Sequence, residues 1–350
     1  MIRFCNDYSE VIHPKILGKL VEVNTGQAGV YGEDTYCERA RELIKGLCGN
    51  DDLHVRFVVG GTLANLLVIS ASLRPHQCVI SPTTGHVATL EAGAIEATGH
   101  KVSTISTDDG KITAEQIESF YSEYTDSDYR VHIAQPKLVF ISFPTEYGTL
   151  YTKDELQAIS DVCKDRNLYL YIDGARLGYG LCAEGNDVDL KFITESCDAF
   201  YIGGTKQGAL LGEAIVIKNE NIAEDFTSII KQRGGLLAKG MILGLQFTAL
   251  FEDDLYFELS KHANKMASLV RDALKKKGVE FFIESQTNQL FPILQNGVLE
   301  GLSEKYLFAN WKKVDDESSV IRICTSWATT EESIGKLIAD MEASLEQSGE

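Results

Sequence analysis

Short, almost continuously apolar segments alternate with helical segments over residues 55–218. Apolar runs of this kind are typical of strands that are buried on both faces of a sheet. Seven strands are predicted, at residues 57–59, 78–81, 101–105, 137–143, 168–172, 199–202 and 214–218. Two of the intervening helices begin at capping boxes, Thr113-Ala-Glu-Gln116 and Thr152-Lys-Asp-Glu155. The alternation predicts an α/β fold with helices on both faces of a mainly parallel sheet.

The pattern changes after residue 246. The elements expected there are a long helix at 257–277, strands near 280–283 and 320–324, and a last helix that opens at residue 329. We therefore predict a large domain over residues 1–246, including the amino-terminal segment, and a smaller α+β domain over residues 247–350.

The composition argues against several classes of protein. A formal net charge of −18 would repel a phosphate backbone, so no nucleic-acid partner is expected. The eight cysteines contain no Cys-x-x-Cys pair and no metal-ligand spacing, which indicates no metal site and a reducing, cytoplasmic location. The amino terminus is polar too early for a signal peptide, and no apolar run approaches the roughly 18 residues of a membrane span. No membrane association is therefore expected.

Three predicted strands end in residues that suit a charged ligand. Ligands of open α/β sheets collect at the carboxyl ends of strands. Gly60-Gly61-Thr62 joins a strand to a helix, where the backbone can approach a phosphate and first-turn N–H groups point at it. Asp173 ends a second strand, and Lys206 follows a third strand and a Gly-Gly-Thr turn. Gly60-Gly61-Thr62 is neither a Walker loop nor a G-x-G-x-x-G motif, so a nucleotide has little support.

Asp173 and Lys206 together predict pyridoxal phosphate (PLP) as a cofactor. A lysine forms a Schiff base with the cofactor aldehyde, and an aspartate keeps the pyridine nitrogen protonated so that the ring accepts electrons. His86 opens a helix after another strand, where its ring could stack on a flat cofactor and exchange protons near neutral pH. A surface lysine, a strand-capping aspartate and a structural histidine are the alternative interpretations of each residue alone. Their combination with the phosphate loop favours the cofactor.

These motifs occur in one order along nearly the whole chain. They are Asn6-Asp7-Tyr8-Ser9, Val30-Tyr31-Gly32-Glu33-Asp34, Gly60-Gly61-Thr62, His86 with Glu91-Ala-Gly93, Asp173-Gly-Ala-Arg176, Lys206 and Arg322. The series resembles that of the low-specificity L-threonine aldolases, in the β-eliminating-lyase group of fold-type-I PLP enzymes. The resemblance implies the fold of that class, a mainly parallel large domain with a smaller carboxyl-terminal domain.

The resemblance also implies a role for each residue. Lys206 would hold the cofactor, Asp173 would contact its pyridine nitrogen and His86 would stack on the ring. The implied cofactor contacts are Gly60, Gly61, Thr62, His86, Asp173, Arg176, Thr205, Lys206 and Lys239. The implied substrate contacts are Asn6, Ser9, Tyr31, Arg176 and Arg322. The two arginines suit a substrate carboxylate because their planar forks make two hydrogen bonds to it.

Three motifs depart from the pattern of the family. Pro144-Thr-Glu146-Tyr147-Gly148 stands where many threonine aldolases have Asn-Thr-His-Asn-Gly, and Asn6-Asp7-Tyr8 replaces Ser-Asp-Thr. Gly234-Gly-Leu-Leu-Ala-Lys239 replaces Gly-Gly-Gly-Met-Arg. Lys239 would take the place of that arginine as a phosphate contact from a neighbouring subunit.

The implied activity is that of a PLP-dependent aldehyde-lyase that cleaves the Cα–Cβ bond of β-hydroxy-α-amino acids to glycine and an aldehyde. A base, His86 directly or through water, would take the β-hydroxyl proton. A PLP-dependent β-eliminating lyase or another amino-acid enzyme on the same scaffold is the alternative, and a non-catalytic binding protein is a third. A homodimer or homotetramer with shared active sites is also implied, because the loops around Tyr31 and Lys239 have no obvious role within one chain.

Overall fold

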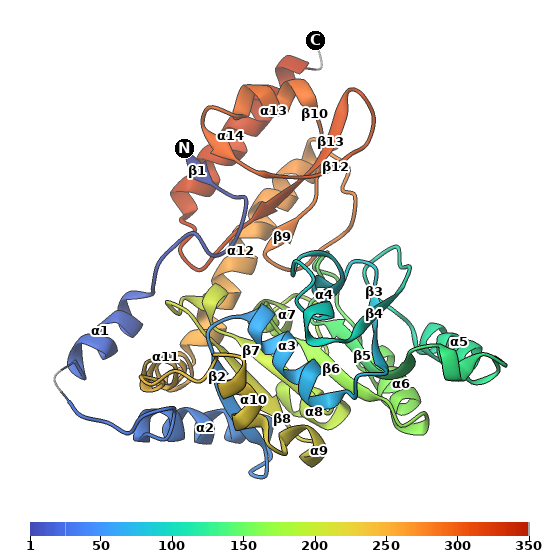
Figure 1. Cartoon of the computed structure of the whole chain (residues 1–350). Coiled ribbons are helices and arrows are strands. Elements are labelled where there is room, and N and C mark those ends of the chain that lie inside the picture. Colours follow the sequence, from blue (N-terminus) through green and yellow to red (C-terminus); the bar gives the residue numbers. More distant parts are fainter. Residues whose placement is uncertain (25, 349–350) are drawn as a thin grey trace.

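The computed structural model describes residues 1–24 and 26–348, which form a broad domain around a central sheet and a smaller domain above it (Figure 1). One long helix, α12 (Leu255–Lys276), runs from the broad domain into the smaller one (Figure 1). The predicted domains at 1–246 and 247–350 include residues 25, 349 and 350, which lie outside the described part of the chain.

The central sheet has seven strands in the order β2-β8-β7-β6-β5-β3-β4. Their bounds are β2 (His54–Val58), β3 (Gln77–Pro82), β4 (Lys101–Ile105), β5 (Gln135–Ser142), β6 (Tyr169–Asp173), β7 (Ala199–Gly203) and β8 (Glu213–Ile217). Strands β3 to β7 are parallel, whereas β8 is antiparallel to both of its neighbours. The predicted mainly parallel sheet is confirmed, and every strand overlaps its predicted range.

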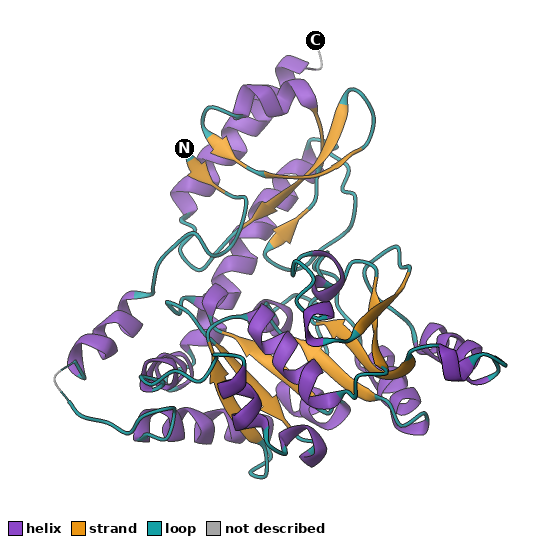
Figure 2. Cartoon of the chain, viewed as in Figure 1, coloured by secondary structure: helices purple, strands orange, loops and turns teal. Residues whose placement is uncertain are grey.

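Helices cover both faces of this sheet (Figure 2). Along β6, Leu170 and Ile172 belong to one buried cluster and Tyr171 to another, as expected for a strand with two buried faces. The first face is covered by α2 (Thr35–Cys48), α5 (Ala114–Thr125), α6 (Lys153–Asp165), α8 (Leu190–Ser196) and α11 (Met241–Phe251), and the second by α3 (Gly61–Ser72), α9 (Glu220–Ala223) and α10 (Phe226–Gln232).

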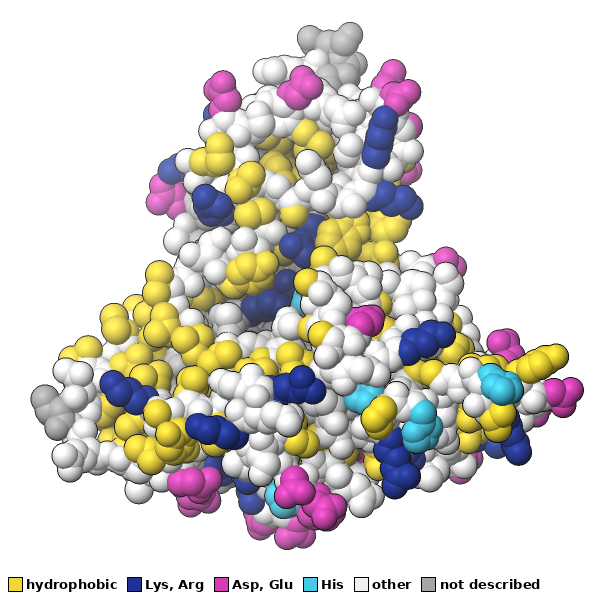
Figure 3. Space-filling model, in the orientation of Figure 1, with side chains coloured by type: hydrophobic (Ala, Val, Ile, Leu, Met, Phe, Trp, Pro, Cys, Tyr) yellow, Lys and Arg dark blue, Asp and Glu magenta, His cyan; other side chains and the backbone are white. Residues whose placement is uncertain are grey.

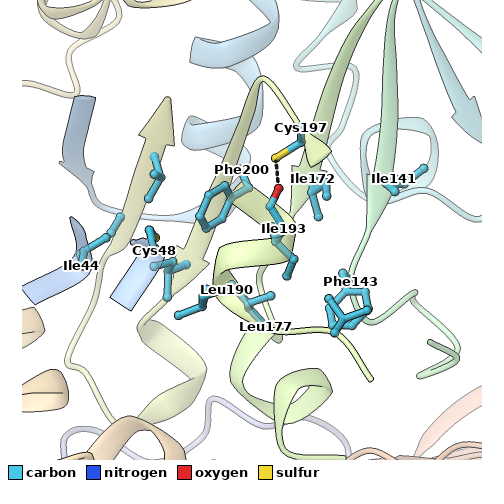
Figure 4. Packing of buried hydrophobic residues seen from close by; sticks show 14 of the residues in the cluster. Ile44, Cys48, Ile141, Phe143, Ile172, Leu177, Leu190, Ile193, Cys197 and Phe200 are labelled. Carbon is cyan, nitrogen blue, oxygen red and sulfur yellow. Dashed lines mark hydrogen bonds between the residues drawn. The ribbon is translucent and has the colours of Figure 1, made fainter. Parts of the chain in front are cut away.

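Figure 4 shows part of the first cluster, where side chains of three adjacent strands meet α8. Ile141, Ile172 and Phe200 come from β5, β6 and β7, and they belong to the same buried cluster as Ile193 of α8 (Figure 4). All four are buried, and each such side chain stabilises the fold by about 1.5–3 kcal/mol relative to an exposed position. This packing fixes the strands whose carboxyl ends carry the predicted site.

Both predicted capping boxes form. Thr113 and Gln116 exchange hydrogen bonds at the start of α5, and Thr152 and Glu155 do so at the start of α6. The remaining elements of the large domain are α1 (Pro14–Glu22), α4 (His86–Thr89), α7 (Leu177–Leu181) and the 3₁₀ turns Glu96–Thr98, Arg130–His132 and Thr205–Gln207.

The smaller domain consists of an antiparallel sheet and the helices packed on it. Its elements are β9 (Gln289–Leu290), β10 (Ile293–Gln295), α13 (Asn296–Leu302), β11 (Tyr306–Leu307), β12 (Ala309–Lys313), β13 (Ser318–Cys324) and α14 (Glu331–Ser348). Strand β1 (Ile2–Arg3) pairs with β11, so the amino-terminal segment also contacts this domain. The strand expected at 280–283 forms only an isolated bridge, from Phe281 to Pro292, because proline has no N–H to extend a ladder.

Within residues 1–24 and 26–348, no helix combines the length and the apolar character that a membrane crossing requires.

Candidate active site

A cavity of about 220 Å³ lies at the carboxyl ends of the central strands. Its wall includes eight predicted site residues: Gly60, Gly61, Thr62, His86, Asp173, Arg176, Thr205 and Lys206. Figure 3 shows dark-blue basic side chains gathered in the hollow between the two domains. The structure therefore brings together most of the residues predicted to bind the cofactor.

Asp173 ends β6, and three donors hold its buried carboxylate in one orientation. Tyr201 donates from its hydroxyl to Oδ1 at 2.6 Å, and the Ala175 backbone N–H donates to the same oxygen at 2.9 Å. Asn65 donates to Oδ2 at 3.0 Å. A carboxylate fixed in this way presents a directed negative charge to a ring nitrogen.

Lys206 lies in the 3₁₀ turn that follows β7. Its backbone carbonyl accepts a hydrogen bond of 2.6 Å from the Tyr179 hydroxyl, which helps to fix the turn. Burial and the positive charge of Arg176 lower the pKa of the Lys206 amine. A larger neutral fraction makes the amine a better nucleophile than an exposed lysine.

His86 begins α4 and is connected to Asp173 by two side chains. Its Nδ1 lies 2.8 Å from Glu91 Oε1, which also accepts a hydrogen bond of 2.7 Å from Asn65. Asn65 donates in turn to Asp173. Burial lowers the pKa of His86, but the Glu91 hydrogen bond and the charges of Asp173 and Glu91 outweigh burial, so the pKa is raised. With Nδ1 engaged, Nε2 is the ring nitrogen left for a ligand.

The predicted phosphate loop forms the start of α3. Gly60 has extended backbone and provides no side-chain cap, so first-turn N–H groups are left for a ligand. A Cβ on Gly61 would lie 2.7 Å from the Tyr201 hydroxyl oxygen, closer than real Cβ atoms approach. Glycine is therefore required at position 61 because Tyr201, which binds Asp173, occupies the space.

Arg176 follows β6 and is already paired with an acid that was not predicted as a site residue. Its Nε and Nη2 donate to the two carboxylate oxygens of Asp7 at 2.7 and 3.0 Å. Asn288 of the smaller domain also donates to Asp7, at 2.9 Å. Burial raises the pKa of Asp7, but the charges of Arg176 and Lys206 outweigh burial and lower the pKa to about 2.

Arg322 lies on β13 and is not among the residues that line the cavity. Its flanking residues Ile321 and Ile323 are buried, whereas Arg322 is half-buried, as expected for a strand whose successive side chains point to opposite faces. The guanidinium lies 5.2 Å from the centre of the Trp311 ring, and Nη2 donates to the Cys5 carbonyl at 3.0 Å. Its buried Nε has no hydrogen-bond partner in the described structure, so it can still bind a ligand that reaches it.

The predicted residues of the amino-terminal motif form a local turn. The side-chain oxygen of Asn6 accepts hydrogen bonds from the Tyr8 backbone at 3.1 Å and from the Ser9 hydroxyl at 2.9 Å. Neither Asn6 nor Ser9 lines the cavity.

Tyr31 and Lys239 are exposed and lie close to each other, outside the cavity wall. The Tyr31 backbone N–H donates to the Ala238 carbonyl at 3.0 Å. Tyr31 has a left-handed backbone conformation, with φ of 59°, which is uncommon for a residue other than glycine. Both predicted loops therefore meet on one surface of the large domain.

Two buried acids of the cavity wall were not predicted as site residues. Glu146 Oε1 accepts hydrogen bonds from the His86 backbone at 2.9 Å and from Ser142 at 2.7 Å, and its Oε2 is buried without a partner among the described residues. Burial and the charge of Asp173 raise the pKa of Glu146. Glu213 begins β8, and the only signal in the sequence is an isolated charge at the start of an apolar run.

Comparison with known proteins places most of the chain in one group. Residues 9–296 match the beta-eliminating lyase family. The chain is 32% identical over 348 residues to low specificity L-threonine aldolases of Pseudomonas sp. and Pseudomonas aeruginosa, covering 97% of this chain and 97% and 96% of theirs.

Solved structures agree with this grouping. A threonine aldolase of Leishmania major is 43% identical, with a TM-score of 0.96 over 99% of this chain and all of that one (100%). A serine palmitoyltransferase of Sphingomonas wittichii, at 14% identity, shares the fold with a TM-score of 0.75 over 99% of this chain and 88% of its own. The architecture is that of fold-type-I PLP enzymes, as predicted.

Proposed function

The chain belongs to the beta-eliminating lyase family, and we propose that its cavity binds pyridoxal phosphate and a β-hydroxy-α-amino acid. It is an aldehyde-lyase of the low-specificity L-threonine aldolase type, an enzyme of amino-acid metabolism. It cleaves the Cα–Cβ bond of its substrate to give glycine and an aldehyde. The observation that carries the cofactor proposal is that Asp173 and Lys206 line one cavity with a glycine loop at a helix start.

The residues of the cavity fit this cofactor. The N–H groups at the start of α3, with Thr62 and Thr205, would hold the phosphate, and Gly61 lets this turn lie against the Tyr201 hydroxyl, which a Cβ would meet at 2.7 Å. Asp173 would face the pyridine nitrogen, His86 would face the ring, and Lys206 would provide the amine that holds the aldehyde. When bound, pyridoxal phosphate supplies an electron sink for the pair left on the α-carbon when the Cα–Cβ bond breaks.

Arg176 and Arg322 would hold the substrate carboxylate. Asp7 occupies Nε and Nη2 of Arg176, so this arginine is held in place and has further N–H groups for a ligand. Arg322 has a buried, unpartnered Nε and stacks on Trp311, within the described residues. Two fixed guanidinium groups would orient the substrate by its carboxylate, which determines where its β-hydroxyl lies.

His86 would take the proton of the β-hydroxyl, directly or through water. Glu91 fixes Nδ1, so Nε2 is available as the acceptor. Removing this proton lets the hydroxyl oxygen form the carbonyl of the aldehyde while the Cα–Cβ bond breaks. Glu146, whose Oε1 accepts from the His86 backbone, is the second acid–base group at this end of the cavity.

We also propose a homodimer or homotetramer with shared sites. Helix α1 lies next to α11 at one side of the large domain (Figure 1), where it buries Ile16, but its outer face exposes apolar side chains, with Leu17 49% and Val21 67% accessible. Figure 3 shows apolar side chains gathered on this side of the molecule. Apolar surface of this kind is typical of a protein interface, and Lys239 could then reach the phosphate of a neighbouring subunit.

A substrate panel tests the activity. The protein is incubated with pyridoxal phosphate and, separately, with L-threonine, L-allo-threonine, L-serine or L-cysteine. Acetaldehyde and glycine from the first two amino acids are expected. Pyruvate from serine or cysteine, without acetaldehyde from threonine, would instead identify a β-eliminating lyase. If no visible absorbance band stays with the protein after incubation with pyridoxal phosphate and removal of the unbound cofactor, the cofactor is excluded.

A further inference from the structure

The loop at residues 144–148 belongs to the large domain but packs against the smaller one. Its first three residues line the cavity. Its last two, Tyr147 and Gly148, contact side chains of the smaller domain. The loop therefore lies between the cavity and the domain that carries Arg322.

Gly148 fits the loop closely to the smaller domain. Its backbone is left-handed, with φ of 74°, a conformation that favours glycine. A Cβ at this position would lie 2.3 Å from Ser285 Oγ and 2.6 Å from Thr287 Oγ1, closer than real Cβ atoms approach. The Ser285 hydroxyl donates a hydrogen bond of 3.3 Å to the Gly148 carbonyl. Little space is therefore left between the loop and the smaller domain at this point.

The ring of Tyr147 contacts three aromatic rings of the smaller domain. Its centre lies 5.7 Å from that of Phe282, and 6.0 Å from those of Phe291 and Trp311. The interplanar angles are 78°, 84° and 70°, so all three contacts are edge-to-face, a geometry that aromatic pairs favour. Phe291 also meets Trp311 at 5.1 Å. Two rings, one from each domain, thus hold Trp311 in place.

Trp311 in turn holds Arg322. The guanidinium carbon lies 5.2 Å from the centre of the Trp311 ring, which is within the range of a cation–π contact. The Cys5 carbonyl accepts a hydrogen bond of 3.0 Å from Nη2. The buried Nε has no partner in the described part of the chain. The indole ring and one carbonyl therefore set the direction of this arginine and leave Nε for a ligand.

We propose that Tyr147 is a positioning residue for Arg322. Its ring holds Trp311, and through Trp311 it holds the guanidinium that would bind the substrate carboxylate. This inference rests on the proposed function of Arg322. The residue before Tyr147 is Glu146, which accepts a hydrogen bond of 2.9 Å from the His86 backbone. One loop thus connects the arginine of the carboxylate end with the histidine of the hydroxyl end, and it fixes their separation.

The test separates binding of the carboxylate from binding of the amino group. The cofactor-loaded, full-length protein is titrated with glycine and, separately, with glycinamide, which has the same amino group and no carboxylate. The change in visible absorbance gives each Kd. Tyr147→Ala should weaken glycine binding by about three- to tenfold, the size of an aromatic contact, and should leave the Kd of glycinamide unchanged. A general structural loss would weaken both ligands.

Two further variants at this position separate the ring from the hydroxyl and from folding. Tyr147→Phe keeps the ring and should bind glycine like the wild type. Tyr147→Leu keeps apolar bulk without a ring, and it replaces the alanine variant if that variant does not fold. Its loss should also be confined to glycine.

Tyr121→Ala is the matched control, because Tyr121 makes a similar contact on α5 outside the cavity wall. Its ring lies 6.4 Å from that of Tyr124 and 5.7 Å from the guanidinium carbon of Arg166. Both Kd values should stay at those of the wild type.

A double variant tests whether Tyr147 acts through Arg322. Arg322→Gln alone should weaken glycine binding by about tenfold or more, and adding Tyr147→Ala should weaken it no further. Equal losses for glycine and glycinamide in Tyr147→Ala, or additive losses in the double variant, would overturn the positioning role. Wild-type glycine binding in Arg322→Gln would overturn both the role of Arg322 and this inference. A wild-type protein that binds no cofactor would overturn the proposed function before any variant is compared.

Discussion

Arg176 donates two hydrogen bonds to Asp7, from Nε at 2.7 Å and from Nη2 at 3.0 Å, although the two residues lie 169 positions apart. Asn288 of the smaller domain donates to the same carboxylate at 2.9 Å. One fully buried acid thus connects the amino-terminal segment, the cavity wall and the smaller domain. The position of an arginine proposed to bind substrate depends on an acid outside the cavity wall.

We predict that Asp7→Asn destabilises the protein and raises the KM for the amino-acid substrate. Removing one partner of a buried ion pair leaves an uncompensated charge and typically costs about 3–5 kcal/mol. The free energy of unfolding in urea and the KM for L-threonine check this. Asn6→Ala is the control. Asn6 makes only local hydrogen bonds, so its replacement should lower the free energy of unfolding less and raise the KM less than Asp7→Asn does. Equal losses in the two variants would contradict the role of Asp7.

The same variant should change how stability depends on pH. Burial raises the pKa of Asp7, but Arg176 and Lys206 lower it from 3.8 to about 2. A lowered folded-state pKa contributes stability above the unfolded-state pKa, and this contribution is lost as pH falls from about 4 to about 2. The difference in unfolding free energy between wild type and Asp7→Asn should therefore shrink over that range.

Lys206→Ala should abolish turnover. The amine is needed to hold the cofactor and to release the product, and its lowered pKa suits it as a nucleophile. The assay combines turnover with borohydride reduction, which fixes the cofactor to the protein only through a Schiff base. Lys164→Ala, an exposed lysine on α6, should behave like the wild type. If Lys206→Ala kept wild-type turnover and its cofactor were still fixed to the protein by borohydride, another lysine would form the Schiff base.

The fold could be predicted because the buried strands of β2 to β8 leave a local pattern. An apolar run that ends in glycine, aspartate or a helix start is visible within about ten residues of sequence. Gly61, Asp173 and Lys206 were identified in this way, since parallel strands bring their carboxyl ends to one edge. The smaller domain was harder to predict from the sequence. The segment at 280–283 has strand-like residues, but its partner is Pro292, which has no N–H to extend a β-ladder.

The missed residues depend on contacts that no local pattern reveals. Asp7 matters because Arg176 and Asn288 meet it, at separations of 169 and 281 residues. Glu213 lies at the start of an apolar strand, and only the antiparallel pairing of β8 with β7 places it beside the Lys206 turn. Residues that end strands are therefore visible in the sequence, whereas the acids that hold them in place are not.

Asp173→Asn should lower the rate by ~10²–10³-fold, because a neutral side chain no longer favours a protonated ring nitrogen. Turnover at saturating pyridoxal phosphate is the measurement. Tyr201→Phe removes one of three hydrogen bonds to Asp173 and keeps the charge, so its loss should be smaller. If Tyr201→Phe loses as much turnover as Asp173→Asn, the orientation of the carboxylate contributes more to the rate than its charge does. Near-normal turnover in Asp173→Asn would show that another residue faces the ring nitrogen.

His86→Gln should reduce aldol cleavage by ~10²–10⁴-fold, the usual contribution of a general base. Exchange of the glycine α-proton, which involves no β-hydroxyl, should change much less and serves as the internal control. Only the neutral imidazole accepts a proton, so cleavage should rise as pH increases through the raised pKa of His86. Glu146→Gln should cost less than about tenfold, because an amide can still accept the hydrogen bond of the His86 backbone. If Glu146→Gln lost more cleavage activity than His86→Gln, Glu146 would be the group that takes the β-hydroxyl proton.

Lys239→Ala should weaken the binding of pyridoxal phosphate if Lys239 reaches the phosphate of a neighbouring subunit. Lys239 is exposed and lies next to the left-handed turn at Tyr31, on the surface where two chains would meet. Mixed oligomers of Lys239→Ala and Lys206→Ala should regain part of the activity, because one site of each hybrid then has both lysines intact. Light scattering gives the oligomeric state, and subunit exchange is checked by mass spectrometry with an isotope-labelled chain. An active monomer, or exchanged subunits without any recovery, would show that each chain builds its own site.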